Sequence, residues 1–231
     1  MRWTAAIVIA TLMLWGCGGG QPQKSQTGKE TEQVKESPQE LRAPALEPVP
    51  VEQLTPPTAE EAGDPDEVGV IDTDYGKIVL EFFADVAPIH VANMKKLARA
   101  GFYDGTTFHR VVPGFVIQGG DPNSRDDDPR NDGLGGPPWH VKAEFNDRPH
   151  LKGTLSMARS PDPNSAGSQF FICLDRTKNL DNEYTVFGKV LKGIEVVDDI
   201  GREARDPRTD AAKPAVKIRS IRIVKRGELE P

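Results

Sequence analysis

Two stretches of the chain combine an arginine, glutamines and aromatic residues in short patterns. The first reads FHRVVPGFVIQGGD, residues 108–121, and the second reads GTLSMARSPDPNSAGSQFFICL, residues 153–174. Arg110 is the residue of most chemical interest, because its guanidinium is always charged and presents a planar fork of N–H donors. A fixed donor of this kind can stabilise electron density that develops only in a transition state.

Together with NLDNEYTVFGKV, residues 179–190, these stretches resemble the cyclophilin-type peptidyl-prolyl isomerases over about residues 68–226. The pattern F-H-R-x-x-P-G-F-x-x-Q-G-G-D matches without a gap, and S-Q-F-F-I follows at the expected later place. The form SMARSPDPNSAGSQFF is most similar to bacterial members. The resemblance implies a peptidyl-prolyl cis-trans isomerase that requires no cofactor and no metal.

The chemistry of such an enzyme follows from the amide bond. Rotation of an X-Pro bond crosses a barrier of about 18–20 kcal/mol because it breaks the C–N resonance. The twisted proline nitrogen regains its lone pair, so a donor aimed at it stabilises the transition state more than the planar ground state. Arg110 is the candidate donor.

The remaining site residues are implied by the resemblance. Gln118 binds the substrate backbone and orients Arg110, and the region of Ala158 pairs with an extended peptide near Gln169. An apolar pocket holds the proline ring and is lined by Phe115, Val116, Phe171 and Leu180, with Tyr184 at its edge.

Three positions depart from the family pattern. Val116 replaces a more usual Met, and Tyr184 stands where many members have His. Asn179 stands where many eukaryotic members carry a Trp that helps to bind cyclosporin, which implies weak sensitivity to that drug.

Several residues have plainer interpretations. His109 is expected to be structural because the reaction moves no proton, and Cys173 in an apolar strand is expected to be an inert buried thiol. Phe170 points to the opposite face of a strand from Phe171 and is expected in the core. The acidic residues 126–132 lack the spacing of a calcium loop and are expected to be solvated.

The elements that position these residues are predicted to be mainly β. Short apolar runs separated by Gly, Pro, Asn or Asp predict strands, and the spacing after Pro88 and after Gly193 predicts two helices. About eight strands that do not alternate with helices favour a closed eight-stranded antiparallel β-barrel with two α-helices. The predicted strands cover residues 68–73, 76–83, 106–112, 115–118, 154–158, 169–174, 185–190 and 216–224.

The N-terminal segment differs from this domain. Residues 1–17 contain Arg2, an apolar run and Leu14-Trp15-Gly16-Cys17, which resembles a bacterial lipobox. We therefore expect a signal peptide at 1–16 and lipid attachment at Cys17; the alternative is an ordinary secretory signal. Three acyl chains would anchor the protein firmly to a membrane.

The next segment is expected to be a tether. Residues 18–66 contain eight prolines and no aromatic residue, a composition that cannot bury enough apolar surface to order itself. The expected organisation is a lipidated, disordered tether at 17–66, an isomerase domain at 67–226 and a C-terminal tail at 227–231.

The chain has 231 residues and a net charge of −6, which argues against nucleic-acid binding. We expect a monomer whose partners are proline-containing polypeptides and, through the lipid, a membrane. The domain would then lie outside the cytoplasm, in the periplasm or at the cell surface, and act on exported or envelope proteins. A proline-binding chaperone or scaffold, in which catalysis is incidental, is the alternative function.

Overall fold

The protein is described by a computed structural model that covers residues 50–126, 128–203, 205–206, 210, 213 and 215–229. The expected signal peptide, the expected lipid attachment at Cys17 and the expected tether up to residue 49 lie outside the described residues. Residues 230–231 of the expected tail also lie outside them. None of the helices formed by the described residues has the length and hydrophobicity that a bilayer crossing requires.

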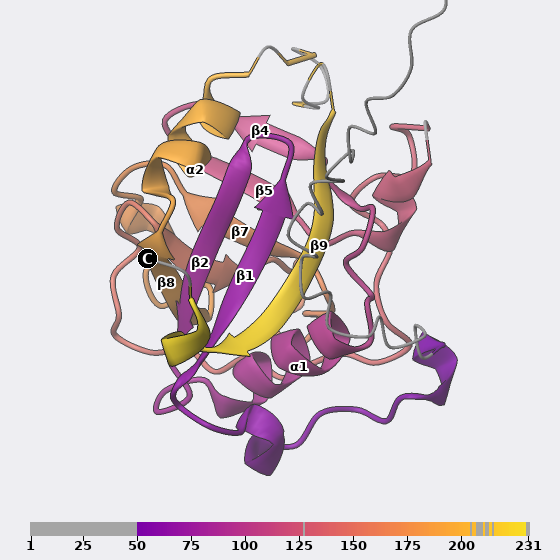
Figure 1. The fold of residues 1–231 in the computed structure, drawn as a ribbon, viewed down its shortest axis with the longest axis vertical. Helices are drawn as coiled ribbons and strands as arrows, with labels where there is room; N and C mark the ends of the chain where they lie inside the picture. The colour runs from indigo at the N-terminus through magenta and orange to yellow at the C-terminus, as the bar shows by residue number, and fades with distance from the viewer. Residues whose placement is uncertain are drawn as a thin grey trace, which may run out of the picture. The chain divides into compact units, whose positions relative to one another are not determined.

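In the described part of the chain, nine antiparallel strands form one sheet that curls into a nearly closed barrel (Figure 1). Their order is β3-β9-β1-β2-β8-β6-β7-β5-β4. The strands are β1 (Glu67–Thr73), β2 (Gly76–Phe82), β3 (Thr107–Phe108), β4 (Arg110–Val112), β5 (Val116–Gly119), β6 (Thr154–Met157), β7 (Phe170–Cys173), β8 (Val186–Lys192) and β9 (Val216–Lys225).

The two ends of this strand order meet on one short piece of chain. β3 pairs with β9 and β4 pairs with β5, and only His109 separates β3 from β4. The sequence predicted one strand over residues 106–112, and the structure divides it at His109. The prediction of a mainly β antiparallel barrel with two α-helices is confirmed, but the strands number nine rather than eight and the barrel is nearly closed.

Two helices cover opposite ends of the barrel (Figure 1). α1 (Pro88–Arg99) packs against β8 and β9, and α2 (Ile194–Gly201) packs against β2, β4 and β5. Proline suits the first turn of α1, where its missing N–H has no helical partner to lose. Gly193, before α2, has φ 84°, and a side chain there would collide with the carbonyl of Lys77. Both helices lie where the sequence predicted them.

Alternate side chains of the strands point into the barrel and form its core. Ile117 of β5 and Ile172 of β7 are fully buried there, as is Phe170. Phe170 meets Tyr103 and Phe108 edge to face, with ring centroids 5.9 and 6.2 Å away. Burial of each such side chain contributes about 1.5–3 kcal/mol.

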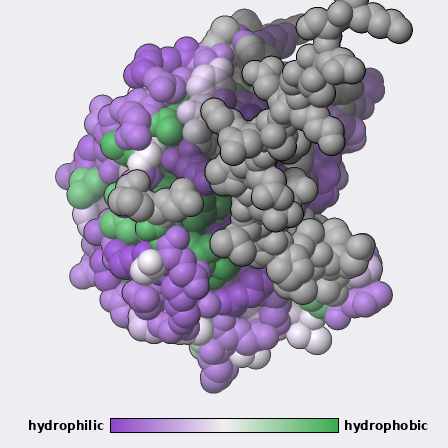
Figure 2. Space-filling view, in the orientation of Figure 1, coloured by the Kyte–Doolittle hydropathy of each residue, from purple (hydrophilic) through white to green (hydrophobic). Residues whose placement is uncertain are grey.

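The outer face of β1, β2 and β9 contains a groove of about 590 Å³ whose lining includes Val70, Val79 and Val224. Hydrophobic residues gather on this face within a mostly hydrophilic surface (Figure 2). The groove is also lined by positively and negatively charged residues, among them Lys77, Glu195 and Arg222.

Short 3-10 turns complete the fold: η1 (Val51–Gln53), η2 (Ala59–Ala62), η3 (Pro122–Arg125), η4 (Lys178–Leu180) and η5 (Arg226–Glu228). The chain already packs on α1 before residue 67. The buried Nζ of Lys95 donates hydrogen bonds to the carbonyls of Ala62 (2.6 Å) and Asp64 (3.1 Å) and pairs with Glu67 at 3.0 Å. The folded part thus begins N-terminal to the expected boundary, because polar contacts to main-chain carbonyls hold a segment that has few apolar residues.

Candidate active site

The site lies on the face of β5 and β7 that points away from the barrel core. Gln118 pairs with Phe171 and Val116 pairs with Cys173, so these four residues share one face, opposite Ile117 and Ile172. Val116, Phe171, Cys173 and Leu180 form a small apolar cluster separate from the core. A second hydrophobic centre is therefore built from the same two strands.

A cavity of about 100 Å³ opens over this cluster. It brings together eight of the nine substrate-site residues expected from the sequence, and Gln169 alone is not in its lining. Their roles in the reaction stay predictions. The lining residues are Arg110, Phe115, Val116, Gln118, Ala158, Arg159, Phe171, Leu180 and Tyr184.

Arg110 is held at the rim of this cavity by neighbours on two sides. Its Nη1 donates to Gln118 Oε1 at 3.4 Å, and its Nε lies 3.8 Å from a carboxylate oxygen of Asp210. Gln118 Nε2 in turn donates to Gln169 Oε1 at 3.1 Å, and Gln169 Nε2 donates to the carbonyl of Gly135 at 2.9 Å. Gln169 therefore supports the site through Gln118. With 37% of its side chain exposed, Arg110 can reach a bound molecule.

Phe171 forms the floor of the cavity between two other rings. Tyr184 meets it edge to face at 5.7 Å between centroids, and His150 stacks against it at 5.9 Å. An aromatic pair of this kind contributes about 0.5–1.5 kcal/mol beyond its buried area. The position of Phe171 is thereby fixed from both sides.

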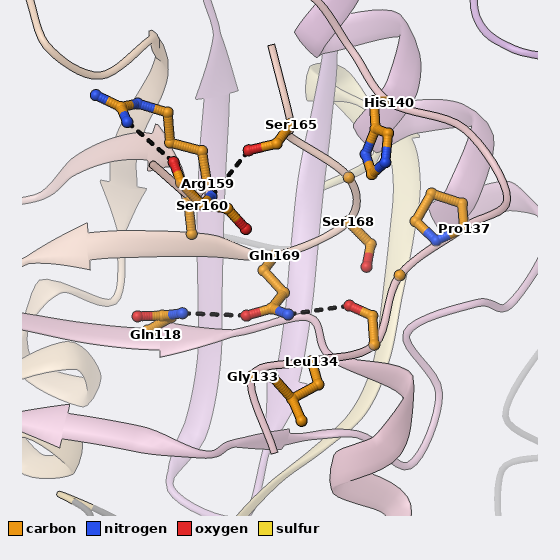
Figure 3. Close-up of a pocket in the computed structure, with 14 residues that line it drawn as sticks. Gln118, Gly133, Leu134, Pro137, His140, Arg159, Ser160, Ser165, Ser168 and Gln169 are labelled. Atoms are coloured by element: carbon orange, nitrogen blue, oxygen red, sulfur yellow. Dashed lines mark hydrogen bonds between the residues drawn. The ribbon is translucent and has the colours of Figure 1, made fainter. Parts of the chain in front are cut away.

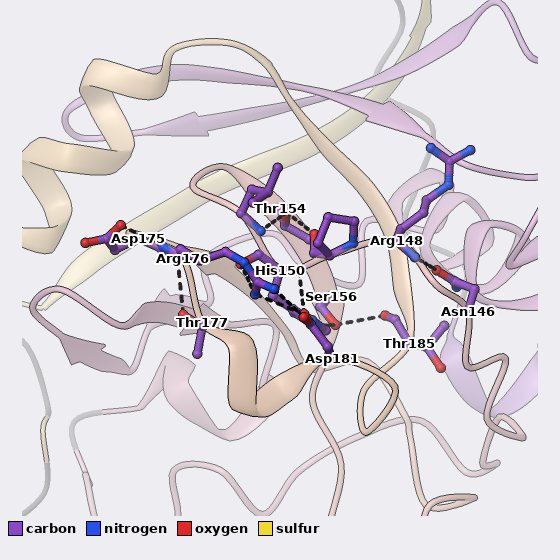
Figure 4. A network of polar contacts seen from close by, with 12 residues as sticks. Asn146, Arg148, His150, Thr154, Ser156, Asp175, Arg176, Thr177, Asp181 and Thr185 are labelled. Atoms are coloured by element: carbon purple, nitrogen blue, oxygen red, sulfur yellow. Dashed lines mark hydrogen bonds and ion pairs between the residues drawn. The ribbon is translucent and has the colours of Figure 1, made fainter.

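His150, which stacks on Phe171, belongs to a polar network that Figure 4 shows. His150 Nδ1 lies 3.2 Å from Asp181 Oδ1, and His150 Nε2 lies 3.0 Å from Ser156 Oγ, which donates to the carbonyl of Thr185 at 2.9 Å. These residue types match a hydrolytic Ser-His-Asp triad. Ser156 is fully buried, however, and cannot meet a substrate. The network is a support for the pocket floor.

Burial and ion pairing set the protonation of this network. Desolvation lowers the pKa of His150, which favours the neutral imidazole, although Asp181 opposes that shift. The guanidinium of Arg176 holds the pKa of Asp181 well below its usual range.

A larger polar cavity of about 350 Å³ adjoins the first one and shares Gln118, Ala158 and Arg159 with it (Figure 3). Its opposite wall is the loop segment 133–137. The buried carboxylate of Asp121 shapes this loop by accepting hydrogen bonds from the main-chain N–H groups of Gly133 and Gly135. The described residues of the acidic stretch, 126 and 128–132, do not line the cavity.

The other candidate side chains, His109 and Cys173, are buried in forms that do not favour reaction. His109 is buried, and desolvation lowers the pKa of its imidazole. Burial also raises the pKa of the Cys173 thiol to about 12, which keeps it protonated and unreactive. The described residues contain no cluster of His, Cys, Asp or Glu that could hold a metal ion.

Comparisons with known proteins agree with this fold. Residues 69–223 match the family described as cyclophilin type peptidyl-prolyl cis-trans isomerase/CLD. A peptidyl-prolyl cis-trans isomerase from Synechococcus elongatus is 49% identical, with 52% of this chain and 77% of that protein aligned. A probable peptidyl-prolyl cis-trans isomerase from Brucella abortus is 45% identical, with 68% and 82% aligned.

A solved structure gives the same result. A cyclophilin-type isomerase from Cryptosporidium parvum, crystallised in the presence of the dipeptide Ala-Pro, superimposes with a TM-score of 0.63 at 31% identity and covers 68% of this chain and 99% of its own. The chain belongs to the cyclophilin-type peptidyl-prolyl cis-trans isomerase family. The prediction of an enzyme with this activity is confirmed.

Sequence reasoning missed one residue of the apolar cavity, Arg159, which also lines the polar cavity. It directly follows Ala158, which the resemblance had placed beside the peptide. The sequence signal that could have identified Arg159 was an arginine in a loop, residues 158–168, whose other residues are mostly small and polar. Its contacts with residues 183–184 could not be read from the sequence, because they depend on how two distant loops meet.

Proposed function

We propose that this isomerase accelerates X-Pro rotation by aiming the Arg110 guanidinium at the proline nitrogen while the apolar cavity holds the ring. The observation that carries this proposal is the position of Arg110 at the rim of a cavity floored by Phe171 and lined by Phe115 and Leu180. A permanently charged donor next to an apolar hollow suits an imide that twists without gaining or losing a proton.

The substrate is an extended polypeptide that contains proline. Gln118 Oε1 and the main-chain carbonyl of Ala158 provide hydrogen-bond acceptors beside the cavity, whereas the N–H of Ala158 donates to the carbonyl of Gln169. Main-chain hydrogen bonds bind an extended peptide with little dependence on its sequence. The presence of Ala-Pro with the Cryptosporidium parvum relative supports this class of ligand.

The natural substrates are exported or envelope proteins. This part of the proposal rests on residues 1–17, which have the pattern of a lipoprotein signal that ends at Cys17. Exported chains arrive unfolded, and prolyl isomerisation is slow enough to limit their folding. A lipid-anchored monomeric isomerase would meet them as they emerge at the membrane.

The test of the mechanism compares the full chain with its Arg110→Ala and Arg110→Lys variants on a proline-containing peptide, without a coupled protease. Loss of one preorganised donor should lower kcat/KM about 10²–10³-fold. Lysine, a point charge without the planar fork, should restore only part of the activity. An Arg110→Ala variant as active as the parent would remove the proposed mechanism.

The anchoring proposal has its own test. Mass spectrometry of the mature protein from its native host should show an N-terminus at Cys17 that carries acyl groups. A mature chain that begins elsewhere, or an unmodified Cys17, would contradict the anchor and leave the isomerase activity untouched.

A further inference from the structure

Arg159 is an arginine whose side chain is largely covered where the two cavities meet. Only 13% of its side chain is exposed, and it lines both the apolar cavity and the polar cavity beside it (Figure 3). Burial of a guanidinium is costly unless its N–H groups are satisfied. The partners that satisfy it therefore indicate what it does.

Those partners come from two separate loops. Nη1 donates to the carbonyls of Ser160 at 3.0 Å and Pro161 at 3.1 Å. Nε and Nη2 donate to the carbonyl of Glu183 at 3.2 and 2.9 Å. A single guanidinium thus links the loop after β6 to the turn before β8.

The face of the same guanidinium covers Tyr184. The central carbon of the Arg159 guanidinium lies 4.6 Å from the centroid of the Tyr184 ring, within the range of a cation–π contact. The Tyr184 ring also meets Phe171 on the cavity floor. Tyr184 is therefore held between a stacked guanidinium and the floor of the cavity.

We propose that Arg159 is a positioning residue that fixes Tyr184 as the wall of the proline cavity. It acts through Tyr184 and not on the rotating bond, because its Nε, Nη1 and Nη2 all donate to main-chain carbonyls. The inference rests on the proposed function only in taking this cavity as the proline-ring site.

A planar cation is required for this role. Lysine keeps the charge, but its single ammonium cannot reach two loops and stack on a ring at once. Arg159→Ala and Arg159→Lys should both raise KM for a proline-containing peptide about three- to tenfold, as expected for loss of one cation–π contact and its supporting bonds. The kcat should change less than about twofold, because the wall contacts the ring in the ground state and the transition state alike.

Arg148 provides a matched control. It too stacks over an aromatic ring, with its guanidinium 4.0 Å from the centroid of Phe83, and it pairs with Asp85 at 2.7 Å. Arg148 lines neither cavity. Arg148→Ala should therefore leave KM at the parental value.

The decisive experiment is a double-mutant cycle with Tyr184→Ala in the full chain. If Arg159 acts through Tyr184, Arg159→Ala should add no further rise in KM once Tyr184 is absent. Independent, additive effects of the two substitutions would overturn the proposal, as would a parental KM in Arg159→Ala or in Arg159→Lys. Circular dichroism checks the fold of each variant, and if the alanine variant is unfolded, Arg159→Lys carries the cycle.

The same assay separates this inference from the proposed mechanism. Full activity of Arg110→Ala would overturn the Arg110 mechanism without affecting the KM comparison. Parental KM in the Arg159 variants, together with an inactive Arg110→Ala, would overturn the positioning role alone.

Discussion

Strands β5 and β7 contribute to two hydrophobic centres that differ in purpose. Towards the barrel interior, Ile117, Ile172 and Phe170 are fully buried among other apolar side chains. On the opposite face, Val116 and Phe171 form a small cluster that remains open to a cavity and is edged by Arg110 and Gln118. One face stabilises the fold and the other is available to a ligand.

This difference indicates how the enzyme separates stability from activity. Successive side chains on a strand point to opposite faces of the sheet. The interior residues can therefore pack tightly without taking positions from the residues that line the cavity. Polar side chains such as Gln118 occupy only the outer face. Substitutions of neighbouring residues should therefore affect different measurements.

The largest expected effect contrasts Phe170 with Phe171. Phe170→Ala removes a ring packed against Tyr103 and Phe108 and should lower the free energy of unfolding by about 3–5 kcal/mol. The Phe171 ring lines a cavity, so Phe171→Ala should lower the free energy of unfolding less than Phe170→Ala does. It should instead lower kcat/KM. Denaturant unfolding and the peptide assay on both variants measure the contrast, and equal destabilisation would show that the two faces are one core.

A smaller effect is expected at the neighbouring pair Ile117 and Gln118. Gln118→Ala removes the hydrogen bond that Arg110 donates to Gln118 and the one that Gln118 donates to Gln169. It should lower kcat/KM about tenfold, equivalent to about 1.4 kcal/mol. Its free energy of unfolding should stay near that of the parent, whereas Ile117→Val should lower stability by about 0.5–1.5 kcal/mol with activity retained. The reverse pattern would contradict the division of the two faces.

The smallest effect concerns pH. Burial lowers the pKa of His109 and of His150, so the folded state favours their neutral forms and the unfolded chain binds more protons. Their contribution to stability is complete above the ordinary histidine pKa of about 6.5 and decreases as the pH falls below it.

Denaturant unfolding at about pH 8 and about pH 5.5 measures this decrease. His109→Gln should make it smaller, because it removes a buried imidazole that the unfolded chain protonates more readily than the folded one. His140→Gln, at an exposed position, is the control. A pH dependence unchanged in His109→Gln would show that this buried imidazole does not contribute.

The sequence was sufficient to predict the strands and helices because hydrophobic alternation, Pro88 and Gly193 act locally. The resemblance carried by the F-H-R motif and the later S-Q-F-F-I run further implied which residues line one pocket. What could not be predicted depends on contacts between distant segments. The interruption of the strand at His109, the hydrogen bonds from Lys95 to the segment 62–64 and the stacking of Arg159 on Tyr184 all need the tertiary fold.

The proposed mechanism requires that Arg110 stabilises the twisted imide more than it binds the planar one. NMR exchange spectroscopy of a proline-containing peptide measures both its affinity and its cis-trans exchange rate on the enzyme. For Arg110→Ala we expect the exchange rate on the enzyme to fall about 100-fold or more while Kd changes less than about threefold. A variant that binds the peptide much more weakly but exchanges the bound peptide at the parental rate would contradict the account.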